Sequence, residues 1–540
     1  RKKLQVIICV LLVELCERFT FFGIVCNMIL FCTVKLGYSN YLAATVNLGF
    51  IGASTLSPVL VGWFAETCLG RTKVLYLCAF LHFFTAMLPV VAFPFEDFYI
   101  DTHHMTHQLE PREQQILFYT GLLAAALGIG GIRAILCPMG AYSLQGYNQH
   151  QLLSFFNFYW LVNLNSIVVF LGIAYIQQSV AKNLAFLIPF TSVLLALIAI
   201  HMMRNKLTYK PKKGSLLTTL GVFLNSLKMC CLHYRHLSGD VASWLDRAKE
   251  NNGGRYSETH VENVKVLAKL FPLYGLQLLY RACVTQIPSG YYIQTMNSNL
   301  HLNDLLLPIG AMNVIGILPL LLLAPLIECV TTCYLASGKT PLSPAKLILG
   351  HMCAALSVLV AGLSELQRKS YPLVEQTLSG KVLQVSSMPC FQLAPQYVLL
   401  GLAEALVTPA SLISFQLTPS HIRGISLHFL TLSYGGGCFL GAFIVQLMYF
   451  VSGNFYPNML HDGNLERFFF ILATLMAINT VAFWSVSYVF TCCLILSRYI
   501  DLSVQGKALT GSLLAEKLLH YKASLRFYDT VDHASIESIL

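Results

Sequence analysis

Long apolar runs recur along this 540-residue chain and constrain its fold more than any other feature. A helix that spans a bilayer needs roughly 20 mainly apolar residues. Reading the chain with a window of that size gives twelve candidate spans, six on each side of the longest polar segment. They are residues 4–34, 41–64, 74–94, 115–137, 152–176, 184–203, 266–294, 305–333, 345–366, 391–416, 424–451 and 467–497. No run alternates apolar and polar residues as the strands of a membrane barrel do. We therefore predict an all-α membrane protein with twelve transmembrane helices in two groups of six.

The charge content argues against most soluble protein classes. Only 11% of the residues are charged and 56% are hydrophobic, whereas soluble domains carry about 25% charged residues. A soluble chain of this length would need more charge to cover several cores. The net charge of +10 does not indicate a nucleic-acid partner, because membrane proteins collect Lys and Arg on one side of the bilayer. We expect no nucleic-acid partner.

The cysteines and the known catalytic motifs give no sign of an enzyme. The 17 cysteines lie mostly inside the spans, where they behave as small apolar residues. No CxxC pair or Cys/His spacing typical of a metal site occurs outside the spans. Metalloprotease, hydrolase and nucleotide-binding motifs are also absent from the sequence. We therefore predict neither an enzyme nor a bound cofactor or metal.

Polar segments divide the chain into four parts. We predict a six-helix bundle at 1–203, a linker at 204–265, a second six-helix bundle at 266–500 and a tail at 501–540. Lys and Arg gather on the side that holds the linker and the tail, whereas the 95–114 loop on the opposite side is acidic. Both termini and the linker are therefore predicted to be cytoplasmic. The middle of the linker is either an amphipathic helix on anionic lipid or a solvated connector.

Three ionisable residues lie inside the first span: Glu14, Glu17 and Arg18. Such residues are costly at the bilayer centre, so they indicate a pathway or a pairing. Their spacing of three and four residues places them on one face of a helix. Arg18 can then neutralise one carboxylate and leave the other to take up a proton, as proton coupling requires. The alternative is a structural ion cluster that only fixes the packing of the helix.

A further cation, Arg133, lies in the fourth span. It follows a glycine-rich stretch at residues 128–131, and glycines allow helices to approach closely. We expect this approach to bring Arg133 near the first-span carboxylates.

Arg281 is a third cation inside the membrane, in the seventh span. We expect it to have no acidic partner at its depth, because Glu328 and Glu404 lie near span ends and residues 405–461 contain no Asp or Glu. A bound anion, backbone carbonyls or water would then have to offset its charge.

Several segments resemble the motifs of the proton-coupled oligopeptide transporters, solute carrier family 15. The resemblance lies in Glu14–Gly23 (ExxERFxYYG), Gly128–Ala134 (GxGGIKP), Phe158–Asn165 (FYxxINxG) and Pro395–Glu404 (PQYxLxGxxE). Gly62–Arg71 is similar to the GWxADxxLGR loop of the major facilitator superfamily, and Gly172–Gln178 points toward the peptide/histidine branch. Together these segments cover about residues 5 to 450 in the right order.

The resemblance implies a major facilitator fold, in which two six-helix bundles rock around a midplane site and protons drive the uptake of di- and tripeptides. It implies that the first-span charges handle the proton and the substrate carboxylate, and that Arg133 stands where the family has a lysine. The proton-coupling candidates are Glu14, Glu17, Arg18 and Arg133. The substrate-binding candidates are Arg18, Phe21, Phe22, Asn163, Arg281, Gln286, Asn313 and Ile413.

The chain departs from the family pattern at four places, one of which is Arg281, a cation added near an aromatic position of the family. Ile413 lies about where the tenth-span glutamate that holds the peptide amine should fall. The second span, 41–64, lacks the histidine of the mammalian peptide carriers, and Phe21 and Phe22 replace a tyrosine pair. A carboxylate is the obvious acceptor for a free amine in a dry pocket. We therefore expect ordinary dipeptides to bind weakly and anionic solutes to compete better.

The prediction for function is a proton-coupled secondary active transporter of peptide-like solutes, which include di- and tripeptides, histidine and small anionic solutes. The alternative is a transport-incompetent family member that acts as a membrane sensor or scaffold. The predicted partners are protons, the solute and the lipid bilayer. We expect a monomer in the plasma or endolysosomal membrane.

Overall fold

The computed structural model describes residues 2–92, 110–144, 163–180, 187–205, 216–233, 243–336, 343–415 and 423–504. Its long helices follow the predicted spans closely. The helices of the first half are α1 (Lys2–Leu30), α2 (Asn40–Phe64), α3 (Arg71–Ala92), α4 (Pro111–Leu144) and α6 (Leu187–Met203). Short π-helical turns are η1 (Phe31–Lys35), η2 (Ala65–Leu69), η3 (Val169–Ile173) and η4 (Ile176–Val180). Residues 163–168 are also helical.

The second half repeats this pattern of long helices. It contains α8 (Glu258–Val284), η8 (Ile287–Tyr291), α9 (Tyr292–Met296), α10 (Ala311–Ala336), α11 (Ser343–Ser370), α12 (Ala394–Phe415), α13 (Arg423–Val451) and α14 (Leu465–Val504). Short 3-10 turns are η9 (Cys390–Leu393) and η10 (Gly453–Phe455). The sequence predicts one continuous helix over the seventh span, 266–294. In the structure this span is interrupted between α8 and α9. Pro288 lies at this break, where its ring and its missing N–H disrupt regular helix.

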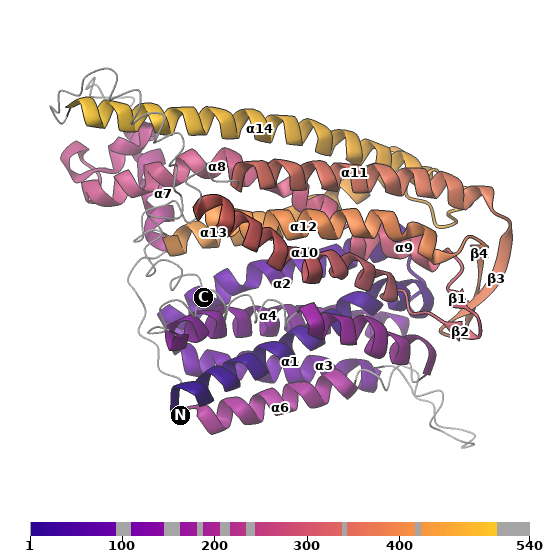
Figure 1. Cartoon of the computed structure of the whole chain (residues 1–540). Coiled ribbons are helices and arrows are strands. Elements are labelled where there is room, and N and C mark those ends of the chain that lie inside the picture. Colours follow the sequence, from indigo (N-terminus) through magenta and orange to yellow (C-terminus); the bar gives the residue numbers. More distant parts are fainter. Residues whose placement is uncertain are drawn as a thin grey trace.

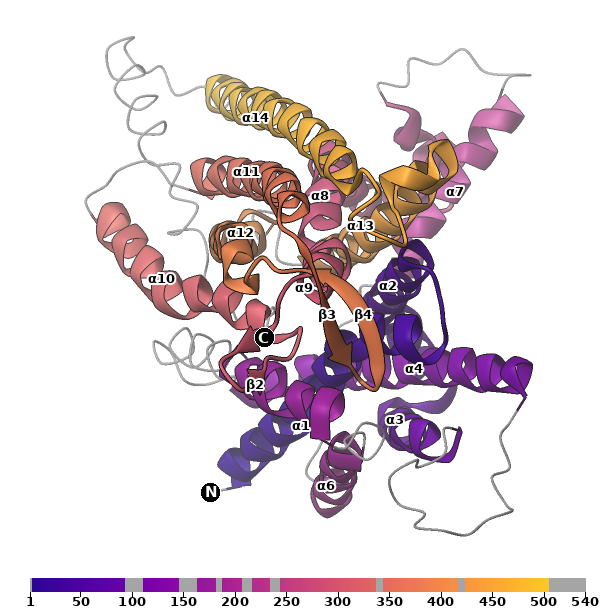
Figure 2. The same cartoon turned by 90° about the vertical axis from the view of Figure 1, so that its right-hand side faces the viewer.

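The two halves lie side by side. The long helices run along a common direction in Figure 1, and the end-on view of Figure 2 separates the α1–α6 group from the α8–α14 group. Helices α2 and α13 pack against each other at the boundary. Gly52 of α2 makes room there, since a Cβ at this position would lie 2.9 Å from the Phe439 ring of α13.

Six described segments are long and apolar enough to cross a membrane. They are Asn40–Leu69, Pro111–Ile135, Ala345–Ser370, Cys390–Thr408, His428–Val451 and Leu465–Val489. Two shorter apolar helical segments are Thr191–Met203 and Ala311–Leu323. The helical, multi-pass character is confirmed, and the full number of twelve spans stays a prediction.

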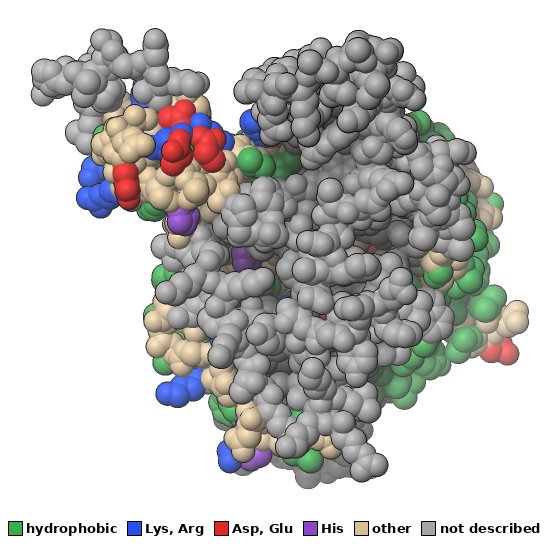
Figure 3. Space-filling view, turned by 60° about the vertical axis from the view of Figure 1, so that its left-hand side comes forward, with side chains coloured by type: hydrophobic (Ala, Val, Ile, Leu, Met, Phe, Trp, Pro, Cys, Tyr) green, Lys and Arg blue, Asp and Glu red, His purple; other side chains and the backbone are tan. Residues whose placement is uncertain are grey.

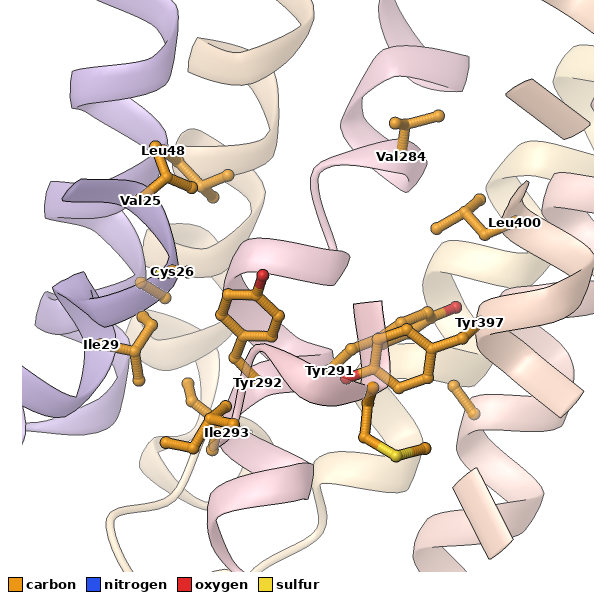
Figure 4. Close-up of a cluster of buried hydrophobic side chains, with 14 of the residues drawn as sticks. Val25, Cys26, Ile29, Leu48, Val284, Tyr291, Tyr292, Ile293, Tyr397 and Leu400 are labelled. Carbon is orange, nitrogen blue, oxygen red and sulfur yellow. The ribbon is translucent and has the colours of Figure 1, made fainter. Parts of the chain in front are cut away.

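An apolar core joins the halves around α9. Figure 4 shows Tyr292 facing Cys26 and Ile29 of α1, and Tyr291 beside Tyr397 of α12. The ring centroids of Tyr291 and Tyr397 are 5.4 Å apart. The short helix that follows the break in α8 is therefore packed between the first and second halves.

Two hairpins cap one end of the molecule and were not predicted. They are formed by β1 (His301–Leu302) with β2 (Leu305–Leu306), and by β3 (Leu373–Leu378) with β4 (Lys381–Ser386). The β3–β4 turn consists of Ser379 and Gly380, with φ angles of 50° and 84°, as a two-residue type I′ turn requires. Figure 2 shows this hairpin crossing the end of the bundle toward the first half. Ser379 Oγ donates to the Gln178 carbonyl at 3.2 Å.

The opposite end carries a small helical unit from the predicted linker (Figure 1). Helix α7 (Leu216–His233), η6 (Trp244–Ala248) and η7 (Glu250–Asn252) precede α8. Val222, Leu245 and Val261 form its buried core. Helix α8 starts at Glu258, inside the segment predicted as linker, because residues such as Val261 pack against η6 and extend the helix. Figure 3 shows the acidic and basic side chains gathered on this unit.

Candidate functional site

Glu17 is the centre of an ion cluster in the first half. The residue is 1% exposed. Arg133 of α4 donates from Nε to Glu17 Oε1 at 3.1 Å, and a second guanidinium nitrogen lies 3.0 Å from the same oxygen. Arg18 Nε lies 3.7 Å from Glu17 Oε2. The expectation that Arg133 meets the first-span carboxylates is confirmed, and one buried carboxylate is shared by two cations.

The glycines that precede Arg133 let α4 pack closely against α2 and α3. A Cβ at Gly130 would overlap Ser57 Oγ of α2, and a Cβ at Gly131 would overlap Cys78 Sγ of α3. Helix α4 therefore lies closely against both neighbours because these positions have no side chain.

Glu14 and two asparagines border the cluster. Glu14 is 9% exposed, one turn before Glu17 on the same face of α1. Asn165 Nδ2 donates to the Leu15 carbonyl at 3.3 Å. The candidate Asn163 lies two residues earlier and is half-buried, and its carbonyl accepts a bond from Ser166 Oγ at 2.6 Å.

Aromatic rings form an apolar wall beside these charges. The Arg133 guanidinium carbon lies 4.6 Å from the ring centroid of Phe21, which is cation–π distance. The ring centroids of Phe21 and Phe22 are 5.6 Å apart, and those of Phe22 and Phe170 are 5.5 Å apart. The site thus presents guanidinium groups next to aromatic surface.

In the second half, the structure overturns the expectation that Arg281 lacks an acidic partner. Arg281 donates to Glu404 Oε1 at 3.2 Å, and its guanidinium carbon lies 4.2 Å from the Tyr434 ring centroid. Glu404 lies at the centre of the 22-residue α12 rather than near the end of its span. The prediction was wrong because the depth of each charge depends on how α8 and α12 pack.

The remaining substrate-binding candidates are separated in the structure. Gln286 is buried at the break after α8, and its Nε2 donates to the Ala282 carbonyl at 3.2 Å. Asn313 Nδ2 donates to the Tyr292 hydroxyl at 3.2 Å, in the core that joins the halves. Ile413 lies in the last turns of α12, and the role predicted for its side chain falls outside what the structure describes.

Sequence reasoning missed a second buried ion pair. In α11, Arg368 Nη2 lies 2.7 Å from Glu365 Oε1. Gln294 of α9 donates from Nε2 to Glu365 Oε2 at 3.0 Å. The available signal was the spacing of three residues within the ion pair, with Glu365 at the end of the predicted ninth span and Arg368 just beyond it. This network ties α9 to α11. Within the described ranges, no group of three or more His, Cys, Asp or Glu side chains is arranged to hold a metal ion.

Comparison with known proteins gives the family. The model of the POT family matches residues 91–459, which is more than half of the chain. The chain belongs to the POT family. The first-span cluster lies before the matched residues, whereas Arg133, Arg281 and Glu404 lie within them.

Relatives of this POT family member cover nearly its whole length. The human protein solute carrier family 15 member 5 is 54% identical over 541 residues, which is 99% of this chain and 92% of the relative. Mouse solute carrier family 15 member 3 is 26% identical over 518 residues, 88% of this chain and 89% of the relative.

Solved structures of POT family transporters share the fold. An auto-inhibited POT family peptide transporter gives a TM-score of 0.68 at 17% identity, covering 89% of this chain and 96% of that one. A POT family transporter in complex with 5-aminolevulinic acid gives a TM-score of 0.64 at 16% identity. The match covers 88% of this chain and 94% of that one. The major facilitator fold is confirmed, and family and fold are those of membrane transporters, not of enzymes.

Proposed function

We propose that this POT family member is a proton-coupled symporter of peptide-like solutes that works by alternating access. The observation that carries the proposal is the buried Glu17 carboxylate shared by Arg133 and Arg18. Protonation of Glu17 would remove the charge that holds both guanidinium groups. The released cations, Arg18 and Arg133, would then be available to the carboxylate of a solute. Glu14 is assigned to the same proton-handling group.

The pairing of Arg281 changes the expected solute preference. The anion preference assumed an uncompensated Arg281, but Glu404 provides the missing negative charge. The side chains are 24% and 26% exposed, so a solute in water could reach both. A partly open pair presents an acceptor for an amine and a donor for a carboxylate, which matches a zwitterion. Residues 405–461 contain no Asp or Glu that could bind the amine of the solute. We therefore assign this role to the Glu404 carboxylate.

Contacts between the halves support an alternating-access cycle. At the end that carries the hairpins, Asn47 Nδ2 donates to the Pro288 carbonyl at 2.6 Å, and Gln178 Nε2 donates to the Leu307 carbonyl at 3.0 Å. From the asymmetry of Lys and Arg in the sequence, we place this end outside and both termini in the cytoplasm. We infer a state closed to the outside, in which opening requires these inter-half bonds to break.

Uptake into liposomes tests the proposal. The purified protein should accumulate radiolabelled alanylalanine when the lumen is alkaline relative to the bath, with histidine and succinate compared in parallel. Glu17→Gln should abolish this accumulation but keep exchange of internal for external dipeptide, because the amide preserves shape and does not titrate. Glu113→Gln, which changes an exposed acid in the first turn of α4, is the matched control.

Two results would count against the proposal. Gradient-driven accumulation in Glu17→Gln at the wild-type rate would move coupling to another residue. The absence of both accumulation and exchange for every solute in the wild-type protein would favour the sensor or scaffold instead.

A further inference from the structure

His82, in the middle of α3, is a buried ionisable residue that the mechanism above does not use. Its side chain is 1% exposed, and neither ring nitrogen has a hydrogen-bond partner among the described residues. Buried polar groups are almost always hydrogen-bonded, because leaving them unpaired costs free energy. An unpaired imidazole at this position therefore needs an explanation.

His82 lies at a close approach of α3 and α4. A Cβ at Gly128 of α4 would lie 3.0 Å from the His82 Cβ and 3.0 Å from its backbone nitrogen. Gly131, two residues before Arg133 on α4, would place a Cβ against Cys78 Sγ, one helical turn before His82 on α3. The charges of Glu17 and Arg133 both act on the His82 ring. The imidazole therefore belongs to the same electrostatic cluster.

Among the described residues, the charges that act on His82 are those of Glu17 and Arg133. The charged and titratable side chains of the cluster are Glu14, Glu17 and Arg18 of α1, Arg133 of α4 and Cys78 of α3 itself. Helix α6 also packs on α3, but its His201 contacts Tyr76 instead. The turn η2 adjoins the first turn of α3, about three helical turns before His82.

Glu17 has one oxygen available to receive a proton. Arg133 holds Oε1, whereas Oε2 has no hydrogen-bond partner among the described residues. A neutral imidazole has one acceptor nitrogen and one donor nitrogen. Both nitrogens of His82 are unoccupied by described groups, so the ring has an entry and an exit for a proton.

We propose that His82 relays protons to and from Glu17. A proton that arrives through water binds the lone pair of one ring nitrogen, and the other nitrogen passes its own proton to a bridging water, which gives one of its protons to Glu17 Oε2. The imidazole returns to its neutral form with the opposite tautomer, and Glu17 becomes neutral. Arg133 and Arg18 then lose their counterion. The relay depends on the coupling role proposed for Glu17, and it adds the path by which the proton reaches that carboxylate.

The first experiment compares proton-driven uptake of alanylalanine by His82→Gln and His82→Asn. We expect accumulation to fall at least about tenfold, as for loss of a proton-transfer group, and its pH dependence to flatten. Dipeptide exchange should remain, which shows that the variants are folded. The matched control is His351→Gln in α11, because His351 is also fully buried with unpaired ring nitrogens. It packs between Tyr280 and Phe483, with ring centroids 4.9 Å and 4.6 Å away.

The second experiment needs no solute. A pH jump applied to protein-containing membranes on a solid support should produce a transient current as protons enter the cluster. This current should slow at least about tenfold in His82→Gln and stay at the wild-type rate in His351→Gln.

The two experiments separate the relay from the proposed function. Wild-type uptake rates, pH profile and pH-jump current in His82→Gln would overturn the relay and leave proton coupling intact. If the wild-type protein accumulates no solute, the proposed function fails, and the pH-jump current alone decides whether His82 conducts protons to Glu17.

Discussion

Glu17 and Arg281 show which charge partners can be predicted from a sequence. Glu17, Arg18 and the glycine-rich approach to Arg133 each leave a local pattern, so this cluster is predictable. Arg281 and Glu404 are 123 residues apart, and their common depth arises only from the packing of α8 against α12. His82 could not be selected from the sequence either, because no motif contains it and its burial against Gly128 appears only in the fold.

The Arg281–Glu404 pair can be tested at the residue scale. Glu404→Gln should lower the free energy of unfolding by about 1–3 kcal/mol, because Arg281 loses its counterion inside the protein. This is less than the about 3–5 kcal/mol typical of a fully buried pair, since both side chains are partly exposed. Thermal unfolding of detergent-purified protein measures the loss.

A double variant provides the control for this prediction. Arg281→Met combined with Glu404→Leu removes both charges and should recover most of the lost stability. If the double variant is as unstable as Glu404→Gln, or less stable, the pairing of charge does not explain the effect.

At the scale of elements, the long helices are predictable and the short ones are not. Each span is a continuous apolar run, as in α13, which was predicted at 424–451 and lies at Arg423–Val451. The β3–β4 hairpin has a local signal in the Ser379-Gly380 turn, but a 20-residue hydropathy window averages it away. The break after α8 depends on a single proline, Pro288, within an otherwise apolar stretch.

The hairpin turn gives a prediction of its own. Gly380 has φ of 84°, so Gly380→Val should strain the turn by about 1–2 kcal/mol. Ser379 would then hold Gln178 less firmly, and backbone amides of residues 373–386 should exchange hydrogen faster. Lys381→Ala, at an exposed neighbouring position, is the control. Unchanged exchange in Gly380→Val would mean that the turn does not hold the hairpin in place.

The helical unit between the halves should depend on pH. Burial raises the pKa of Asp246, but hydrogen bonds from Lys265 and Lys249 outweigh it and hold this pKa below 3.8. Hydrogen bonding from Lys249 likewise holds the pKa of Glu262 below 4.5. Burial lowers the pKa of Lys265, but hydrogen bonds from Asp246 and Glu262 outweigh it and raise it above 10.5.

The signs define a window of stability for this unit. A carboxyl group whose pKa is lowered by folding stabilises the folded protein at any pH above its ordinary pKa. This stabilisation is lost as the pH falls through the pKa of the folded protein, below about pH 4. The raised lysine pKa stabilises it below 10.5 and loses its effect as pH rises further. Trp244, which packs 6.0 Å from Phe223, should therefore report undocking of η6 by its fluorescence under acid. Asp246→Asn should move this undocking to higher pH, and an unchanged acid midpoint would contradict it.

At the scale of the whole molecule, the apolar runs are sufficient to predict the class of fold but not the state it adopts. The helical class and the positions of the long helices follow from local hydropathy. The contacts between halves do not, because they join distant residues such as Asn47 and Pro288. In this state the halves are joined at the hairpin end, and the ion cluster of α1 and α4 lies beside α2 and α3. Proton uptake by Glu17 is the step that the account makes central.

The most direct test of that step is proton movement driven by the solute itself. Liposomes that contain the protein and a pH-sensitive dye are prepared with equal pH inside and outside, and alanylalanine is added to the bath. We predict acidification of the lumen by the wild-type protein and by Glu113→Gln, and none by Glu17→Gln. Entry of the dipeptide into wild-type liposomes without acidification would contradict proton coupling.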